Sequence, residues 1–381
     1  MFRLLFLFIL LHCNDIKRPP LYSLLFPSLA SSETIAVISS DFGSSGRFTT
    51  LNQDVLLATP TSVAVHSDAI ATYQNGLVYI VNRLGRDNIQ VLNPSLGFLT
   101  ILEFSVGAGS NPQDIIVVNS TKAYVSLYSK NYLLVVNPSS GVEIKRIDLS
   151  KFSETITNSS SGLDGNPEAH RMYLYENKLY LQLQRLDRND SSGFPAPTDF
   201  SYLLEFDTLN DSLIGAYRTP SSNPLGKMHK VDLNGVPHLL MCLPARLGFL
   251  SKLDGGVYAF NLLNKKFLPN PIYSEQIAKG DILDIVIKPN EFGYAYVLDP
   301  SFNKSIQKFS LSTGQKISEL GFFSATAGNI GGLGISTSGK FFVGDANFSK
   351  PGVSVFDVNT DQRLTPISID VGLRPTQILI Y

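Results

Sequence analysis

The chain has 381 residues, enough for two or three average domains or for one large repeat architecture. Apolar residues make up 44% of it, which excludes a wholly disordered chain, and the net charge of −1 excludes the concentrated basic surface of a nucleic-acid binder. Its two cysteines, Cys13 and Cys242, exclude a disulfide framework and a cysteine-rich zinc site.

Residues 1–12 predict an export signal. They hold one arginine, Arg3, followed by an apolar run that is too short to cross a membrane as a helix. Cys13 follows directly, and the tripeptide before it resembles a bacterial lipobox, whose cysteine becomes the lipid-modified first residue. Residues 13–32 are then expected to be a tether between a lipid anchor and the folded part.

Two other interpretations of this segment stay open. His12 departs from the small residue that usually precedes a lipobox cysteine, and cleavage after Ala30 would release a secreted chain beginning at Ser31. An uncleaved membrane anchor is the third interpretation. All three place the folded part outside the cytoplasm.

Residues 33–381 contain seven copies of one strand pattern. Each copy alternates apolar and polar residues or packs β-branched and aromatic ones, and ends at Asn, Asp or Ser, as a strand entering a hairpin does. The copies are GRFTTLN (46–52), NIQVLN (88–93), YLLVVN (132–137), YLLEFD (202–207), GVYAFN (256–261), SIQKFS (305–310) and GVSVFD (352–357).

Three further strand series accompany this one. One runs upstream of it, as in GLVYIVN (76–82), and one follows the turn, as in VEIKRIDL (142–149). Four antiparallel strands repeated seven times predict an all-β, seven-bladed β-propeller over residues 33–381. The series expected to form the innermost strands comprises PTSVAV (60–65), PQDIIVV (112–118), GDILDIVI (280–287) and PTQILIY (375–381).

The order of the strands also predicts how the ring closes. The chain enters with a second strand at residues 33–39 and ends with a first strand at residues 375–381. We therefore expect one blade to combine a C-terminal first strand with three N-terminal strands. No helix is needed in this arrangement.

The motifs Pro-x-x-[Ile/Val], Leu-Tyr-Val-x-Asn and Ile-x-Val-x-[Asn/Asp], followed by a glycine-containing turn, resemble the YVTN-type β-propeller repeats of exported bacterial proteins. The resemblance is clearest in residues 76–149 and 293–381 and loose in residues 150–290. It implies a protein of the cell envelope, with lactonases and dehydrogenase subunits of the same fold as more distant relatives. Because one fold carries many functions, the resemblance leaves the activity open.

Connection lengths distinguish the two faces of the predicted ring. The connections from first to second and from third to fourth strands are short, and we call their side the turn face. Longer segments at 150–166, 185–201, 219–226 and 244–255 emerge on the opposite side, the loop face. Long loops on a rigid scaffold often carry function, although drift at a tolerant surface gives the same pattern.

Aromatic and arginine side chains in these long loops are the candidate contacts for a protein, peptide or glycan partner, because such residues are the usual anchors of interfaces. They are Arg185, Arg188, Phe194, Arg246 and Phe249.

Two histidines interrupt the apolar pattern of the innermost strands. Where other blades have Val63 and Ile115, two neighbouring blades have His170 and His229. Such polar groups could bind a ligand or act as acid and base, or they could bond to one another in a water-filled channel. The charged residues near them are Glu168, Arg171, Lys227, Lys230 and Asp284.

A metal site would need a third ligand, for which Glu168 and Asp284 are the available donors, and we expect neither a metal nor a cofactor. The sequence predicts a non-catalytic binding propeller held to the envelope by a lipid anchor. The alternative is a lactonase-like hydrolase that uses His170, His229, Glu168 and Asp284. A purely structural role in the envelope is the third possibility.

Overall fold

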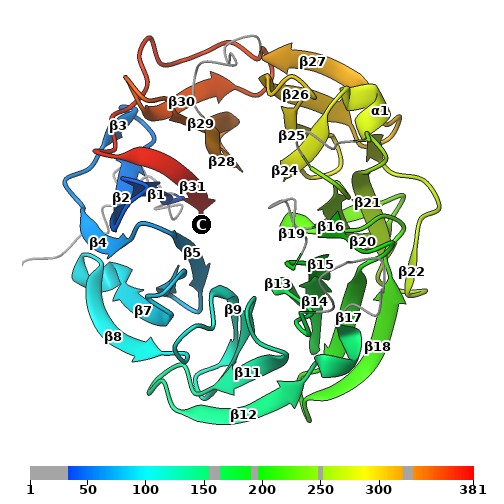
Figure 1. The fold of residues 1–381 in the computed structure, drawn as a ribbon. Helices are drawn as coiled ribbons and strands as arrows, with labels where there is room; N and C mark the ends of the chain where they lie inside the picture. Colours follow the sequence, from blue (N-terminus) through cyan, green and yellow to red (C-terminus); the bar gives the residue numbers. More distant parts are fainter. Residues whose placement is uncertain (1–32, 154–163, 190–195, 248–251, 321–328) are drawn as a thin grey trace, which may run out of the picture. The chain divides into compact units, whose positions relative to one another are not determined.

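The strand repeats fold into a ring of antiparallel sheets in the computed structural model (Figure 1). The structure describes residues 33–153, 164–189, 196–247, 252–320 and 329–381. The export signal, the tether with Cys13, and the loop residues Phe194 and Phe249 lie outside these ranges. Across the described ranges, no helix is long and apolar enough to cross a membrane.

The sheets are the seven blades of the predicted propeller, and each runs from an innermost strand at the channel to the rim. The first blade contains β31 (Arg374–Ile380), β1 (Ile35–Ser40), β2 (Ser45–Asn52), β3 (Leu57–Ala58) and β4 (Val63–His66), and the second contains β5 (Ala69–Gln74), β6 (Leu77–Asn82), β7 (Asn88–Asn93) and β8 (Leu99–Ser105). The third blade contains β9 (Pro112–Asn119), β10 (Lys122–Leu127), β11 (Tyr132–Val136) and β12 (Glu143–Asp148). The fourth contains β13 (Ala169–Tyr175), β14 (Lys178–Leu183), β17 (Tyr202–Asp207) and β18 (Ser212–Arg218).

The fifth blade contains β19 (Leu225–Leu233), β20 (Val236–Leu243), β21 (Gly256–Asn261), β22 (Lys266–Phe267) and β23 (Tyr273–Ser274). The sixth contains β24 (Asp281–Lys288), β25 (Phe292–Leu298), β26 (Lys304–Ser310) and β27 (Lys316–Leu320), and the seventh contains β28 (Asn329–Ile335), β29 (Lys340–Ala346) and β30 (Gly352–Asp357). In the seventh blade, two isolated bridges, at Val353 and at Phe356, replace the fourth strand. The remaining short elements are the strand pair β15 (Leu186–Asp187) and β16 (Ala196–Pro197) and the helical turns η1 (Pro94–Leu96), η2 (Ser150–Phe152) and α1 (Glu275–Ala278).

The ring closes as the strand order predicts. The C-terminal strand β31 pairs antiparallel with β1, with Ile378 opposite Val37. The innermost strands contact one another in the order β31, β5, β9, β13, β19, β24 and β28, and β28 returns to β31. The two ends of the propeller therefore share one sheet, visible where red meets blue in Figure 1.

The assignment of residues 60–65 to an innermost strand is wrong. Residues of this segment form β4, which pairs with β2 at the rim and places Val63 opposite Phe48. The innermost strand is β5, which turns into β6 through Asn75 and Gly76, both with positive φ. Such a two-residue Asn-Gly hairpin makes the strand just before it the partner of the strand just after it. Val63 therefore does not line the channel.

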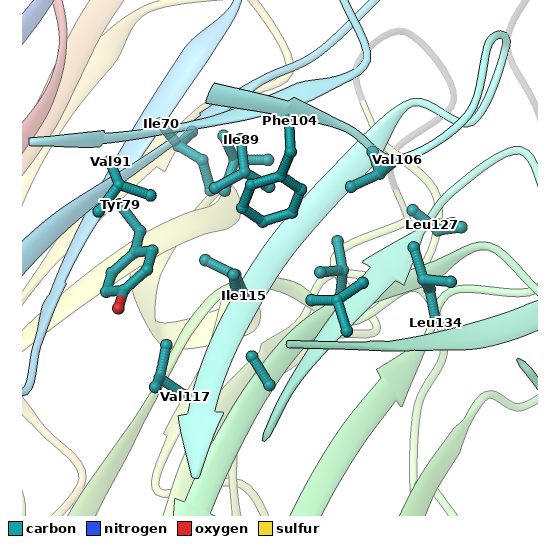
Figure 2. Packing of buried hydrophobic residues seen from close by; sticks show 14 residues of the cluster. Ile70, Tyr79, Ile89, Val91, Phe104, Val106, Ile115, Val117, Leu127 and Leu134 are labelled. Atoms are coloured by element: carbon teal, nitrogen blue, oxygen red, sulfur yellow. The ribbon is translucent and has the colours of Figure 1, made fainter. Parts of the chain in front are cut away.

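The core of the propeller lies between the blades. The buried apolar side chains of the described residues fall into seven clusters, one at each junction of neighbouring blades. Figure 2 shows the cluster between the second and third blades, where Phe104 packs toward Ile115 and Val106. Cys242 belongs to another cluster and is fully buried.

Three junctions are also closed by clusters of tyrosine, lysine and carboxylate near the turn face, which we call the clasps. In each, a tyrosine hydroxyl donates to a carboxylate that also binds a lysine, and the cluster joins two blades. The clasps are Tyr124, Lys122 and Asp211; Tyr180, Lys265 and Glu205; and Tyr294, Lys308 and Asp361.

Candidate functional site at the channel mouth

The innermost strands are irregular near their starts. In six of the seven, the register to the next strand shifts there, and only β5 runs without a shift. A β-bulge re-aims side chains that a regular strand would send to one face or the other. The residues that have no register partner at these shifts are Gln113, His170 with Arg171, Gly226–Met228, Leu283, Gly331 with Gly332, and Thr376.

A cavity of about 460 Å³ lies at these irregular segments. The innermost strands begin at the loop face, and most of the polar lining residues lie in the first half of their strands, so the cavity lies toward that face. We call this site the channel mouth. Its charged and histidine lining residues are Arg83, His170, Arg171, Lys227, His229 and Asp284.

His170 is the most deeply buried of these groups, with 6% of its surface exposed. Its backbone carbonyl accepts a hydrogen bond from Ser126 Oγ at 2.5 Å, but neither ring nitrogen has a hydrogen-bond partner among the described residues. Burial, with the charge of Arg171, lowers the pKa of His170 well below its usual value. The ring is therefore neutral at pH 7 and has an unused donor and an unused acceptor in the cavity wall.

His229 and Lys227 come from the same strand, β19. Burial, followed by the positive charge of Lys227, lowers the pKa of His229 to about 4, and its Nε2 finds no partner within the described ranges. Lys227 itself makes no hydrogen bond or ion pair with a described residue. Burial and the charge of Arg171 lower the pKa of Lys227 as well, against the attraction of Asp114 and Asp284.

The two arginines differ in how completely they are paired. Arg83 forms an ion pair with Asp68 and donates to Gln113 Oε1 at 2.9 Å. Arg171 donates one hydrogen bond, from Nη1 to the Gln113 carbonyl at 2.8 Å, while its Nε has no partner in the described part of the chain. Arg171 therefore has no carboxylate in direct contact, although the charge of the buried Asp114 on β9 raises its pKa against the effect of burial.

Asp284 is the one carboxylate among the described lining residues. Burial raises its pKa to about 6, against the attraction of Lys227, and its Oδ1 accepts the Ile285 N–H at 3.0 Å. Gly226 makes room for it, because a Cβ at this position would lie 2.8 Å from Asp284 Oδ1. Gly226 also has a φ of +72°, which glycine adopts without strain.

Glu168 lies outside the cavity, so three of the four predicted acid and base residues meet at the channel mouth and the fourth does not. Its side chain is fully buried, with Oε2 accepting the Leu186 N–H at 2.9 Å and Oε1 3.1 Å from Arg188 Nε. Glu168 therefore holds the loop that contains β15, together with Arg188.

The predicted loop-face contacts have different surroundings. Arg185 is 1% exposed and donates to the carbonyls of Phe152 and Phe200 at 3.0 and 2.7 Å, so it joins two loops and is not available to a partner. Arg188 binds Glu168 and stays partly exposed, and Arg246 is partly buried. The burial of Arg185 follows from tertiary packing that loop composition does not reveal.

Sequence reasoning missed Arg83 and the bulges. Arg83 follows the second strand of its blade and reaches the channel from there, and a register shift leaves no mark in strand composition. Among the described residues no group of three or more His, Cys, Asp or Glu side chains is placed to hold a metal ion.

Comparison with known families and characterised proteins gave no sequence match. Many solved structures share the fold. A candidate 6-phosphogluconolactonase from Bacteroides fragilis is 16% identical, with 93% of this chain and 100% of that chain covered and a TM-score of 0.60. A protein from Lactobacillus plantarum is 11% identical, with coverages of 92% and 99% and a TM-score of 0.62. Dihydro-heme d1 dehydrogenase NirN is 13% identical, with coverages of 91% and 74% and a TM-score of 0.57. These likenesses establish the β-propeller fold and no activity.

Proposed function

We propose that this chain is an exported, lipid-anchored β-propeller that binds a ligand at the channel mouth without changing it chemically. One observation carries the proposal: a cavity of about 460 Å³ lined by polar groups that have few protein partners in the described structure. Its volume falls in the range of small-molecule sites, about 300 to 1,000 Å³. Buried polar groups without partners cost stability, and a ligand that bonds to them offsets that cost.

The size of the cavity limits the class of partner that can bind there. We expected a protein, peptide or glycan on the loop face, and the channel mouth suits a small ligand or the end of a peptide or glycan chain. Arg185 is committed to holding the loops, which weakens the case for a broad contact surface built on loop side chains.

Comparison of a blocked and an unblocked propeller tests the site. Histidine ring signals in the NMR spectrum of the full chain would be followed during titration with glucose, gluconate and trialanine. His170→Phe fills the cavity and should abolish ligand-induced shifts, whereas Ser338→Phe, on the turn face, should leave them unchanged. Shifts that survive His170→Phe would place binding elsewhere.

The anchor has its own test, the intact mass of the protein from its native membrane. A mass that begins at Cys13 and includes lipid supports the lipid anchor. A chain that starts at Ser31 would make the protein freely secreted, and a full-length mass would favour an uncleaved anchor.

A lactonase-like hydrolase is the second candidate. It is favoured by the neutral His229, whose Nε2 is free among the described residues, because a neutral imidazole in a cavity can act as a general base. His229→Gln should lower lactone hydrolysis by about 100-fold if His229 is the base. A pure binder should show no turnover in the first place.

A further inference from the structure

Two buried cations, Arg171 and Lys227, lie at the channel mouth, whereas Arg83 pairs with Asp68. Two buried carboxylates are within electrostatic reach of these cations, Asp284 in the lining and Asp114 on β9, but neither touches them directly. Neither cation forms an ion pair with a described residue, and both have a pKa lowered chiefly by burial. A protein interior holds such charges only at a cost, unless an anion reaches them.

Three side chains that can donate hydrogen bonds line the same cavity. Arg171 Nε and the ring nitrogens of His170 are buried without partners among the described residues, and Lys227 Nζ brings three more protons. His170 comes from the same bulge of β13 as Arg171, and Lys227 from the larger bulge of β19. Guanidinium, ammonium and imidazole donors in one cavity match the lone pairs of an oxyanion.

We infer that the group entering the channel mouth is an oxyanion, the phosphate or carboxylate of a small organic ligand, held by Arg171, Lys227 and His170. The inference rests on the proposed function and names the chemistry of its ligand. A neutral sugar would leave Arg171 and Lys227 without an ion pair in direct contact. A free cation would be repelled by these two lining side chains.

The structure offers a matched pair of lysines for the test. Lys227 and Lys230 lie on the same strand, but Lys230 is exposed and pairs with Asp232 at 3.2 Å, away from the cavity. Their methionine variants carry the same change in net charge. Any difference between them therefore reports the place of the charge and not the overall field of the protein.

The experiment is calorimetric titration of the full chain with inorganic phosphate and with gluconate, at fixed ionic strength. Wild type should bind phosphate saturably in the millimolar range or tighter. Lys227→Met and Arg171→Met should each weaken binding at least about tenfold, whereas Lys230→Met should change it less than about twofold. A melting curve for each variant confirms that it folds.

Two results would overturn the inference. One is the absence of saturable phosphate and gluconate binding in a folded wild-type protein. The other is equal weakening by Lys227→Met and Lys230→Met, which would mean unspecific attraction. If glucose shifts the histidine signals while phosphate does not bind, the oxyanion inference fails and binding at the channel mouth survives. Tighter binding of gluconate than of phosphate would identify a carboxylate as the preferred group.

Discussion

The clasps near the turn face and the channel mouth use the same kinds of side chain in opposite ways. At the clasps, each carboxylate accepts from a tyrosine and a lysine of the junction it closes. At the mouth, Lys227 and the ring of His170 form no hydrogen bond or close ion pair with a described residue. Charged groups with close protein partners hold neighbouring blades together. Charged groups in the cavity that lack such partners remain available to bind a ligand.

The carboxylate pKa values express this difference. Burial raises the pKa of Asp361, but hydrogen bonds from Ser318, Tyr294 and Lys308 outweigh it and bring the pKa below its usual value. At the mouth, the effect of burial exceeds the lowering by nearby positive charges and a backbone hydrogen bond, and the pKa of Asp284 rises to about 6. A carboxylate with enough donors stabilises its ionised form, and one without them does not.

Breaking a clasp should produce the largest loss of stability. Asp361→Ala leaves Lys308, whose side chain is 9% exposed, without its counter-charge. We expect the free energy of unfolding to fall by about 3 kcal/mol, because a buried cation remains unpaired. Denaturant titration measures it, and phosphate affinity should not change. A loss below about 1 kcal/mol would show that the clasp is a weak surface pair.

Acid should reveal the cost of burying His229. Since its pKa is lowered to about 4, the unfolded chain takes up a proton near pH 6.5 while the folded chain does not. Stability is therefore fully present above pH 6.5 and is lost as the pH falls toward 4. Relative to wild type, His229→Val should gain up to about 3 kcal/mol over this window. Unfolding curves at pH 7 and pH 4.5 test this, and a constant difference between the two proteins would contradict it.

Arg185 distinguishes a structural arginine from a binding one. Arg185→Met removes the donors to the Phe152 and Phe200 carbonyls and should cost about 2 kcal/mol of unfolding free energy. The control Arg86→Met, at an exposed ion pair with Glu103, should cost less than about 0.5 kcal/mol. Ligand titrations should be the same for both variants. Loss of binding with unchanged stability in Arg185→Met would restore its role as a contact.

The fold was largely predictable because the strand pattern and the turn chemistry repeat seven times. An error in assigning one copy therefore leaves the other copies to identify the fold. The exception, residues 60–65, carries the same apolar alternation as an innermost strand, and only the hairpin at Asn75 and Gly76 distinguishes the two. His170 and His229 were found because they interrupt apolar runs. Arg83 and the burial of Arg185 were not, because both depend on register and packing between distant segments.

Asp284 offers the finest test of the contrast between the two regions. It is the one negative charge among the described residues lining the mouth, so Asp284→Asn should strengthen the binding of an oxyanion about fivefold, or roughly 1 kcal/mol. The titratable groups near Asp284 are Lys227, His229, Arg171 and His170 in the lining, and Asp114, which is within electrostatic reach of the same two cations.

The same carboxylate predicts a pH dependence with a definite sign. As the pH falls through about 6, Asp284 takes up a proton and loses its charge, so wild type should bind sulfate more tightly at pH 5 than at pH 7.5. Sulfate keeps its charge over this range, and His229, with a pKa of about 4, stays neutral over most of it. In Asp284→Asn the affinity should depend less steeply on pH than in wild type, because Asp114, whose pKa burial also raises, remains near the two cations. A variant that keeps the wild-type slope would assign the titration to another group and remove Asp284 from the site.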